Sequence, residues 1–182
     1  MNRLIIHILK SFSLIIIIFF LLTCEEGNDV ISRTSSEQLA YDISRIKGYI
    51  KENNLSGFLE TSSGLHYKIT ESGTGKYPTL GDTLYVHYVG QFLNGQQFDK
   101  SNSDLPFEFI LGQGVVIQGW EEGTRLLDKE GSGVFLLPSS LGYGKSPPSS
   151  STIPPNSVLV FAMDLVDVKS VSYTHLTLPT KA

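Results

Sequence analysis

Two adjacent carboxylates, Glu121 and Glu122, directly follow Trp120, which is the only tryptophan of the 182-residue chain. A pair of carboxylates can supply the acid and the base of glycoside hydrolysis when both reach the same bond of a substrate. Neighbouring residues on a helix point about 100° apart, however, so this pair does not converge on one substrate. We therefore expect both side chains on a solvated helix face near the helix start, where the dipole favours negative charge.

The other polar residues that could do chemistry lack the partners that each reaction needs. His66 and His87 fall on separate predicted strands, away from other Cys, His or Asp residues, so we predict no metal site. The serines at 149–151 have no G-x-S-x-G context that would make one of them a nucleophile. Gly73 and Gly75 lie in a glycine-rich turn without the spacing, or the Lys-Ser/Thr, of a phosphate-binding loop. A net charge of −4 with scattered basic residues also predicts no nucleic-acid partner.

The elements that must position these residues are mainly strands from about residue 61 onwards. Asn94-Gly95 is typical of a tight turn, one short helix is expected around 117–127, and a loop rich in Pro, Ser and Gly spans 142–157. The expected strands cover residues 64–70, 83–92, 106–111, 133–138 and 157–168. We predict one α+β domain, in which a curved antiparallel sheet of about five strands wraps around one short helix.

Three stretches of this region follow one another in the chain: GDTLYVHYVGQFLNGQQFDKS, PFEFILGQGVVIQGWEEG and IPPNSVLVFAMDLV. In this order and spacing they resemble the FKBP-type peptidyl-prolyl cis–trans isomerases, over roughly residues 64–169. The resemblance implies an FKBP-like isomerase domain at 61–169 that acts on proline-containing polypeptides. It implies no cofactor, and it makes macrolide-type molecules candidate inhibitors.

Residue types of this kind suit the rotation of an X-Pro bond. Rotation about a peptide bond meets a barrier of about 18–20 kcal/mol, and uncatalysed X-Pro isomerisation takes tens to hundreds of seconds. An apolar pocket disfavours the charge-separated resonance form of the amide, which lowers that barrier. A pocket shaped to the twisted amide also binds the transition state better than either planar form. Such a catalyst needs apolar walls and a few donors, without a nucleophile, a metal or a proton relay.

By this resemblance, apolar and aromatic side chains line a pocket for the substrate proline, with Trp120 as its floor. Asp99 lies at the rim near the twisting carbonyl, and Ile153 closes one side from the long loop. The Ile117 backbone N–H and the Tyr143 hydroxyl bind substrate carbonyl groups. The predicted catalytic residues are Tyr88, Phe98, Asp99, Tyr143 and Phe161, and the predicted substrate-binding residues are Phe107, Val116, Ile117, Trp120 and Ile153.

Two departures from the family pattern bear on substrate preference. The segment 145–153, KSPPSSSTI, is rich in Ser and Pro where the family usually carries glycine, so the preferred residue before proline stays open. Family members often have a basic residue in the loop after the Phe-Asp pair, and whether Lys100 replaces it is also open. The alternative function is a non-enzymatic domain of the same fold that holds Pro-containing segments as a chaperone or complex subunit.

The first 23 residues are typical of a lipoprotein signal peptide. Arg3 and Lys10 precede an apolar run at 12–22 that is too short to span a bilayer, and Cys24 follows it directly. The sequence LLTC resembles the bacterial lipobox, so we predict acylation of Cys24, export, and a membrane anchor facing the periplasm or the cell exterior. A generic signal peptide and an uncleaved anchor that starts at Leu4 are the alternatives.

Residues 24–60 read as a polar tether followed by an amphipathic helix. Leu39, Ile43, Ile46 and Ile50 recur at helical spacing, and Thr34 with Glu37 fits a capping box. The helix packs on its own domain or, alternatively, dimerises weakly through residues 36–52, because a few turns make a poor isolated coiled coil. The last residues, 170–182, match no other part of the chain, and we predict that they lie outside the fold.

Overall fold

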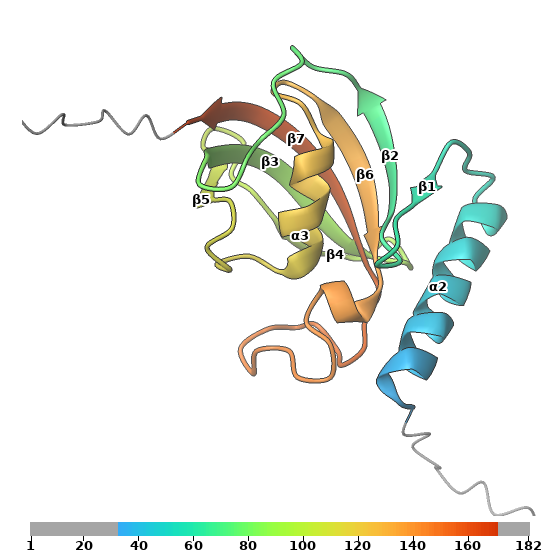
Figure 1. Ribbon diagram of the computed structural model, residues 1–182. Coiled ribbons are helices and arrows are strands. Elements are labelled where there is room, and N and C mark those ends of the chain that lie inside the picture. The colour runs from blue at the N-terminus through green and yellow to red at the C-terminus, as the bar shows by residue number, and fades with distance from the viewer. Residues whose placement is uncertain (1–32, 171–182) are drawn as a thin grey trace, which may run out of the picture. The chain divides into compact units, whose positions relative to one another are not determined.

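The computed structural model describes residues 33–170, which form one antiparallel sheet, two α-helices and two short 3-10 helices (Figure 1). The strands are β1 (Leu59–Glu60), β2 (His66–Glu71), β3 (Thr83–Phe92), β4 (Gln97–Lys100), β5 (Phe107–Ile110), β6 (Ser132–Leu137) and β7 (Leu159–Lys169). The helices are α2 (Ser35–Glu52), α3 (Gln118–Gly123), η1 (Thr124–Leu126) and η2 (Ser139–Leu141). The predicted α+β class is confirmed.

The strands are ordered β1-β2-β6-β7-β3-β4, and β5 pairs with the same edge of β3 as β4 does. The first half of β3 faces β5 and the second half faces β4, so the segment 101–106 leaves the sheet between them. All five expected strands are present, as β2, β3, β5, β6 and β7. The short strands β1 and β4 are additional, and β1 falls within the segment expected to be tether and helix.

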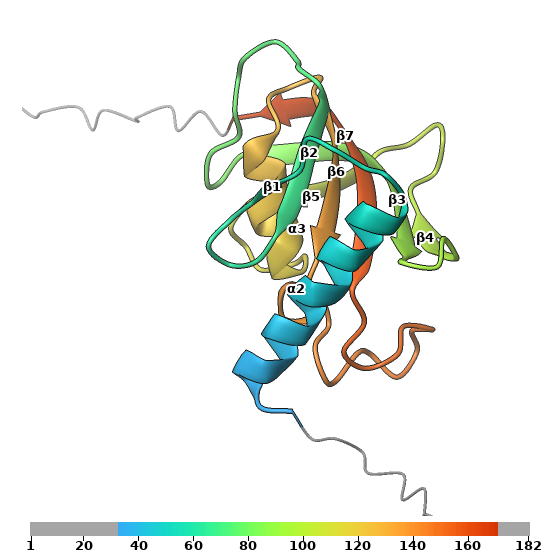
Figure 2. The same cartoon turned by 90° about the vertical axis from the view of Figure 1, so that its right-hand side faces the viewer.

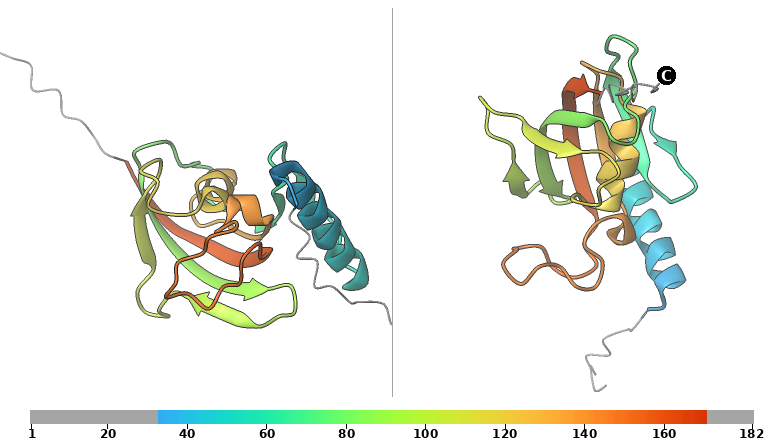
Figure 3. Two further views of the ribbon diagram at one scale, coloured as in Figure 1. Left: turned by 90° about the horizontal axis from the view of Figure 1, so that it is seen from below. Right: turned by 60° about the vertical axis from the view of Figure 1, so that its left-hand side comes forward.

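The concave face of the sheet holds the main core, and α3 lies in it (Figure 3). Alternating residues of β3 and β7 point to this face, including Leu84, Val86, Phe161 and Met163, all of which are buried. Helix α3 approaches β6 closely because Gly119 has no side chain, since a Cβ there would lie 2.2 Å from Cδ2 of Leu137. The short helix therefore sits deep enough to carry side chains into the hollow of the sheet.

Helix α2 packs against the opposite face of the same sheet (Figure 2). Ile46 is fully buried there with Leu136, Val158 and Val160, whose neighbours Phe135 and Phe161 point to the concave side. Further apolar contacts come from Leu39 and Ile43, whose side chains reach Gly64. This is the first of the two expected arrangements.

The start of α2 follows the sequence closely, whereas its buried face does so only in part. The predicted capping box is present, because Thr34 accepts a hydrogen bond from the Glu37 N–H and the Glu37 carboxylate accepts one from the Thr34 N–H. The face that a second copy would need is covered by the helix's own domain, so dimerisation through 36–52 is not supported. The buried residues of α2 also include Gln38 and Asp42, which the apolar periodicity did not single out.

Several predictions fall outside the described residues. The signal segment 1–23, Cys24 and almost all of the tail at 170–182 belong to this group, and they stay predictions. Within residues 33–170, none of the helices combines the length and the apolar character that crossing a bilayer requires.

Candidate active site

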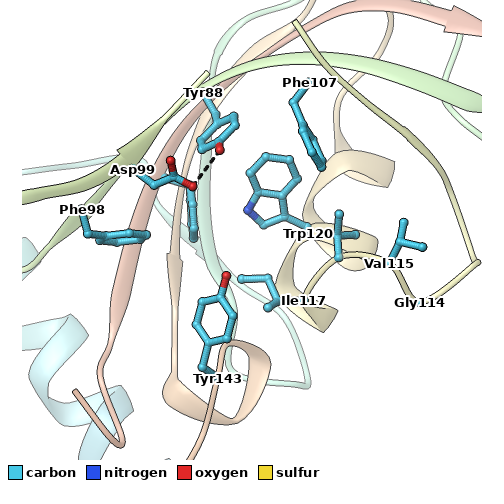
Figure 4. Close-up of a pocket in the computed structure, with 11 residues that line it drawn as sticks. Tyr88, Phe98, Asp99, Phe107, Gly114, Val115, Ile117, Trp120 and Tyr143 are labelled. Atoms are coloured by element: carbon cyan, nitrogen blue, oxygen red, sulfur yellow. Dashed lines mark hydrogen bonds between the residues drawn. The ribbon is translucent and has the colours of Figure 1, made fainter. Parts of the chain in front are cut away.

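A pocket of about 340 Å³ opens between α3 and the concave face of the sheet (Figure 4). Several separate parts of the fold contribute to it: strands β3, β4, β5 and β7, helix α3, and the loops that precede α3 and follow η2. The residues that line it are Tyr88, Phe98, Asp99, Phe107, Gly114, Val115, Val116, Ile117, Trp120, Tyr143 and Phe161.

Trp120 forms the floor of the pocket. Its side chain projects from α3, it is only 4% exposed, and three aromatic rings meet it close to edge-on. Its ring centroid lies 4.8 Å from that of Tyr88, 5.8 Å from that of Phe107 and 5.5 Å from that of Phe161. Edge-to-face contacts of this kind orient aromatic rings, so the floor and walls are held as one apolar cup.

Another wall of the pocket is built by Phe98 against Phe161, with ring centroids 5.7 Å apart and planes at 90°. Gly90 on β3 makes this packing feasible. A Cβ at position 90 would lie 2.8 Å from Cζ of Phe98 and 2.9 Å from Cε1 of Phe161. The missing side chain thus leaves room for both rings at the pocket wall.

The polar groups of the site are few and lie at its rim. The Tyr88 hydroxyl donates a hydrogen bond of 2.8 Å to the carboxylate of Asp99. Burial, followed by this hydrogen bond, raises the pKa of Tyr88 well above its ordinary value. Burial and the nearby charge of Asp99 also raise the pKa of Tyr143. Both hydroxyls therefore stay protonated at neutral pH and act as hydrogen-bond donors.

The Ile117 N–H and the Tyr143 hydroxyl are among the pocket donors that have no acceptor within residues 33–170. Ile117 precedes α3 with an extended backbone, and its carbonyl accepts the N–H of Trp120 and of Glu121. The side chains of Ile117 and Tyr143 lie beside each other in Figure 4. A substrate carbonyl at this edge of the cup can therefore find both donors free.

The structure brings together nine of the ten predicted pocket residues. The exception is Ile153, which does not line the pocket because its side chain is buried in the main core. Sequence reasoning missed Gly114 and Val115, which complete the rim. The sequence feature that could have indicated Val115 is its position as an apolar residue in a glycine-containing loop. In the structure Val115 is 67% exposed.

The carboxylates after Trp120 do not form the free solvated face that we expected. Glu121 accepts the N–H of Gly112 at 2.7 Å and of Gly114 at 3.2 Å. Glu122 accepts the hydroxyl of Ser63, at 2.7 and 2.9 Å from its two oxygens. The two side chains diverge, as predicted, but each one holds a neighbouring loop, and Glu121 holds the loop that carries Val115.

Several other groups considered in the sequence have structural partners. The Gly73 and Gly75 amides, which superficially resembled a phosphate loop, donate to the Asp128 carboxylate at 2.8 and 3.1 Å. The His87 ring nitrogen Nδ1 lies 3.2 Å from the Ser101 hydroxyl oxygen. In the described part of the chain, no three His, Cys, Asp or Glu side chains are grouped so that they could hold a metal.

The comparison with known families decides the identity of this domain. A family profile described as FKBP-type peptidyl-prolyl cis-trans isomerase matches residues 75–166, about half of the chain. The chain belongs to this family. The FKBP domain thus includes every residue that lines the pocket, whereas α2, β1 and β2 precede the matched range.

Individual FKBP-type proteins are also similar to the chain. A probable FKBP-type isomerase FkpA of Neisseria meningitidis is 37% identical over 160 residues, which are 81% of this chain and 58% of that protein. A probable FKBP-type isomerase of Haemophilus influenzae is 45% identical over 109 residues, or 59% of this chain and 44% of that protein. The chain therefore spans about half the length of these relatives.

Solved structures have the same fold. The crystal structure of FkpA from Escherichia coli superposes with a TM-score of 0.62 at 36% identity, covering 74% of this chain and 62% of that chain. A peptidyl-prolyl cis-trans isomerase from Pseudomonas syringae also gives 0.62, at 25% identity, covering 76% of this chain and 98% of that chain.

Proposed function

We propose that the protein is a peptidyl-prolyl cis–trans isomerase that accelerates X-Pro bond rotation in exported proteins. The observation that carries this proposal is the apolar cup above Trp120, with the free donors of Ile117 and Tyr143 at its edge. The proline ring enters the cup, and its flanking backbone is held at the rim.

The mechanism follows from the desolvation of the amide and from the few donors. In the cup the X-Pro amide loses the water that stabilises its planar, charge-separated form, so rotation becomes easier. The Ile117 N–H and the Tyr143 hydroxyl bind backbone carbonyls of the substrate and set its register. Asp99, held by Tyr88 at 2.8 Å, lies at the rim beside the twisting carbonyl. Because these groups fit the twisted amide better than either planar form, they lower the barrier.

A chymotrypsin-coupled assay on an Ala-X-Pro-Phe peptide tests the proposal. We expect wild type to accelerate isomerisation and the combined Phe98→Ala and Asp99→Leu substitutions to remove most of this acceleration. Tyr77→Ala is the matched control, because Tyr77 is an exposed aromatic residue away from the pocket. Equal rates for wild type and the double variant contradict the proposal. Repeating the assay with different residues before proline determines the preference that segment 145–153 leaves open.

The alternative is a domain that binds Pro-containing segments without isomerising them. The apolar side chains of Phe107, Ile110 and Val115, each at least 40% exposed, continue beyond the pocket and favour binding of unfolded polypeptides. Saturable binding of a proline-containing polypeptide, with no acceleration of isomerisation in the coupled assay, supports this alternative. Acceleration that depends on Phe98 and Asp99 rejects it. Macrolide-type inhibitors are expected to compete in either case.

We also propose that the chain is exported and anchored by acyl chains on Cys24. The support is the charged and apolar pattern of residues 1–23 and the position of Cys24 directly after it. Mass spectrometry of the mature protein should find an acylated Cys24 as its first residue. Cys24→Ser should move the protein from the membrane fraction to the soluble exported fraction. A free Cys24 within an intact N-terminus contradicts the anchor.

A further inference from the structure

Asp42 is a buried carboxylate of α2 that precedes the region matched by the family profile. One of its oxygens, Oδ2, accepts the N–H of Ser139 at 2.8 Å and also the Ser139 hydroxyl. The other, Oδ1, accepts the side-chain amide of Gln38 at 2.8 Å. In residues 33–170 no cationic side chain pairs with Asp42. A buried carboxylate is costly unless its oxygens are satisfied, so Asp42 depends on these two neighbours.

Ser139 connects this carboxylate to the pocket. It begins η2, and its carbonyl oxygen accepts the N–H of Gly142 at 3.0 Å and of Gly144 at 2.9 Å. These donors are the residues on either side of Tyr143, so they fix the backbone of Tyr143 relative to Ser139. The carbonyl of Gly144 in turn accepts the Asn156 N–H at 2.7 Å, which closes the base of the long loop.

We propose that Asp42 is a positioning residue for Tyr143, and that through Ser139 it sets where the Tyr143 hydroxyl lies over the proline pocket. The proposal rests on the proposed isomerase function. Because no hydrogen bond within the described part of the chain holds the Tyr143 hydroxyl, its place depends on the Tyr143 backbone and on the packing of its ring against the main core. Ile46 already attaches α2 to the sheet, whereas Asp42 bonds to the start of the Tyr143 loop. Helix α2 thus shapes the site without touching a substrate.

Asp42→Asn tests the proposal, because it keeps the size of the side chain and replaces one acceptor oxygen by a donor. We expect kcat/KM for an X-Pro peptide to fall on the order of tenfold, since small displacements of a binding group are costly. The effect should be mainly a lower kcat with a smaller change in KM. A misplaced donor weakens binding of the twisted X-Pro amide more than binding of the planar substrate. Ser139→Ala, which keeps the backbone N–H, should lose less. If Asp42→Asn does not fold, Ser139→Ala undergoes the same tests.

A double-mutant cycle separates positioning from general destabilisation. In a Tyr143→Phe background, Asp42→Asn should cause no further loss of kcat/KM, because the hydroxyl it positions is gone. Ile46→Val is the matched control: it weakens the packing of α2 without touching Ser139, and its small effect should be the same in both backgrounds. An undiminished effect of Asp42→Asn in the Tyr143→Phe background overturns the proposal.

A second measurement does not depend on turnover. In protein labelled with 3-fluorotyrosine, the ¹⁹F signal of Tyr143, assigned with Tyr143→Phe, should shift or broaden in Asp42→Asn. The signal of Tyr85, which lies on the face of β3 away from the pocket, should stay unchanged in Asp42→Asn. Ile46→Val should change neither the Tyr143 signal nor the Tyr85 signal. An unchanged Tyr143 signal overturns the positioning role. Failure of wild type to accelerate isomerisation, with the shift present, contradicts only the proposed function.

Discussion

At the residue scale, the packing of the pocket wall depends on the absence of a side chain at Gly90. The rings of Phe98 and Phe161 occupy the space that a side chain at position 90 would need. A residue that contributes nothing to the pocket surface therefore controls how close its walls come.

Gly90→Ala should lower kcat/KM on the order of tenfold, because the added methyl displaces both rings by several tenths of an ångström. The same crowding should destabilise the fold by about 1–3 kcal/mol. Coupled peptide assays and urea denaturation measure the two effects. Gly48→Ala is the matched control, since nothing lies within 4 Å of its Cβ and alanine favours the helix, so activity should be unchanged. Full activity of Gly90→Ala contradicts the assignment of these rings as pocket walls.

The raised pKa of Tyr88 leads to a prediction of how the stability of the fold changes at alkaline pH. Its pKa is raised above the ordinary value of 10.0 by burial and by Asp99, so the folded protein holds this proton more tightly than the unfolded chain. The resulting stability is complete below about pH 10 and is lost as pH rises towards the folded pKa. Urea midpoints measured from neutral to alkaline pH should therefore fall more steeply in wild type than in Tyr88→Phe. Parallel curves for the two proteins contradict this origin of the shift.

Most of the pocket residues could be predicted, but their side-chain partners could not. Pocket residues sit in motifs whose residue types and order are visible in the chain. Ile153 differs because the path of a long Pro- and Ser-rich loop decides whether its side chain faces the pocket or the core. The carboxylates of Glu121 and Glu122 accept hydrogen bonds from loops that are distant in sequence or irregular, and no local sequence pattern encodes those contacts.

At the scale of elements, alternation along β3 and β7 predicted the sheet because one face of each strand is buried along its length. The strand β1 could not be predicted, since two residues carry no periodicity and it exists only through pairing with β2. The place of α2 was also open, because an apolar helix face fits a sheet or a second helix equally well. The buried Asp42, a polar residue on that face, is explained by its hydrogen bonds with Ser139 and Gln38.

The Asp128 carboxylate holds the irregular segment that contains Gly73 and Gly75. The amides of Gly73 and Gly75 hold the pKa of its carboxyl below the usual range, with the Gly73 N–H as the largest cause. The resulting stability is present above about pH 4 and is lost as pH falls through the folded pKa. The protection of the Gly73 and Gly75 amides against exchange, relative to the intrinsic rate at each pH, should therefore fall on acidification in wild type, and should already be low at neutral pH in Asp128→Asn.

A control for this prediction is Asp104→Asn, which changes an exposed carboxylate in another loop. It should leave the protection of the Gly73 and Gly75 amides equal to that in wild type at every pH. Slow exchange in Asp128→Asn at neutral pH, equal to wild type, is the outcome that contradicts the role of Asp128.

At the scale of the whole molecule, the sheet is covered on one face by α3 and on the other by α2, and the two layers are linked through the η2 segment. The site draws on strands far apart in sequence, so the pocket exists only when the entire sheet has formed. Folding and substrate binding are therefore expected to be lost together on denaturation.

The apolar mechanism predicts that activity is independent of metal ions. Chelation with EDTA should leave kcat/KM in the coupled assay unchanged, because rotation of the amide needs no Lewis acid in this site. Re-addition of zinc or magnesium should likewise have no effect. A loss of activity on chelation that a metal restores contradicts the proposed mechanism.

The single tryptophan of the chain forms the floor of the pocket. Its indole is shielded from water by Tyr88, Phe107 and Phe161, so any molecule that enters the cup changes the surroundings of the only indole fluorophore. Intrinsic fluorescence excited at the indole band therefore reports occupancy of this pocket alone, without a label. Binding of peptides and macrolide-type molecules can therefore be screened directly by tryptophan fluorescence, whether or not they are turned over.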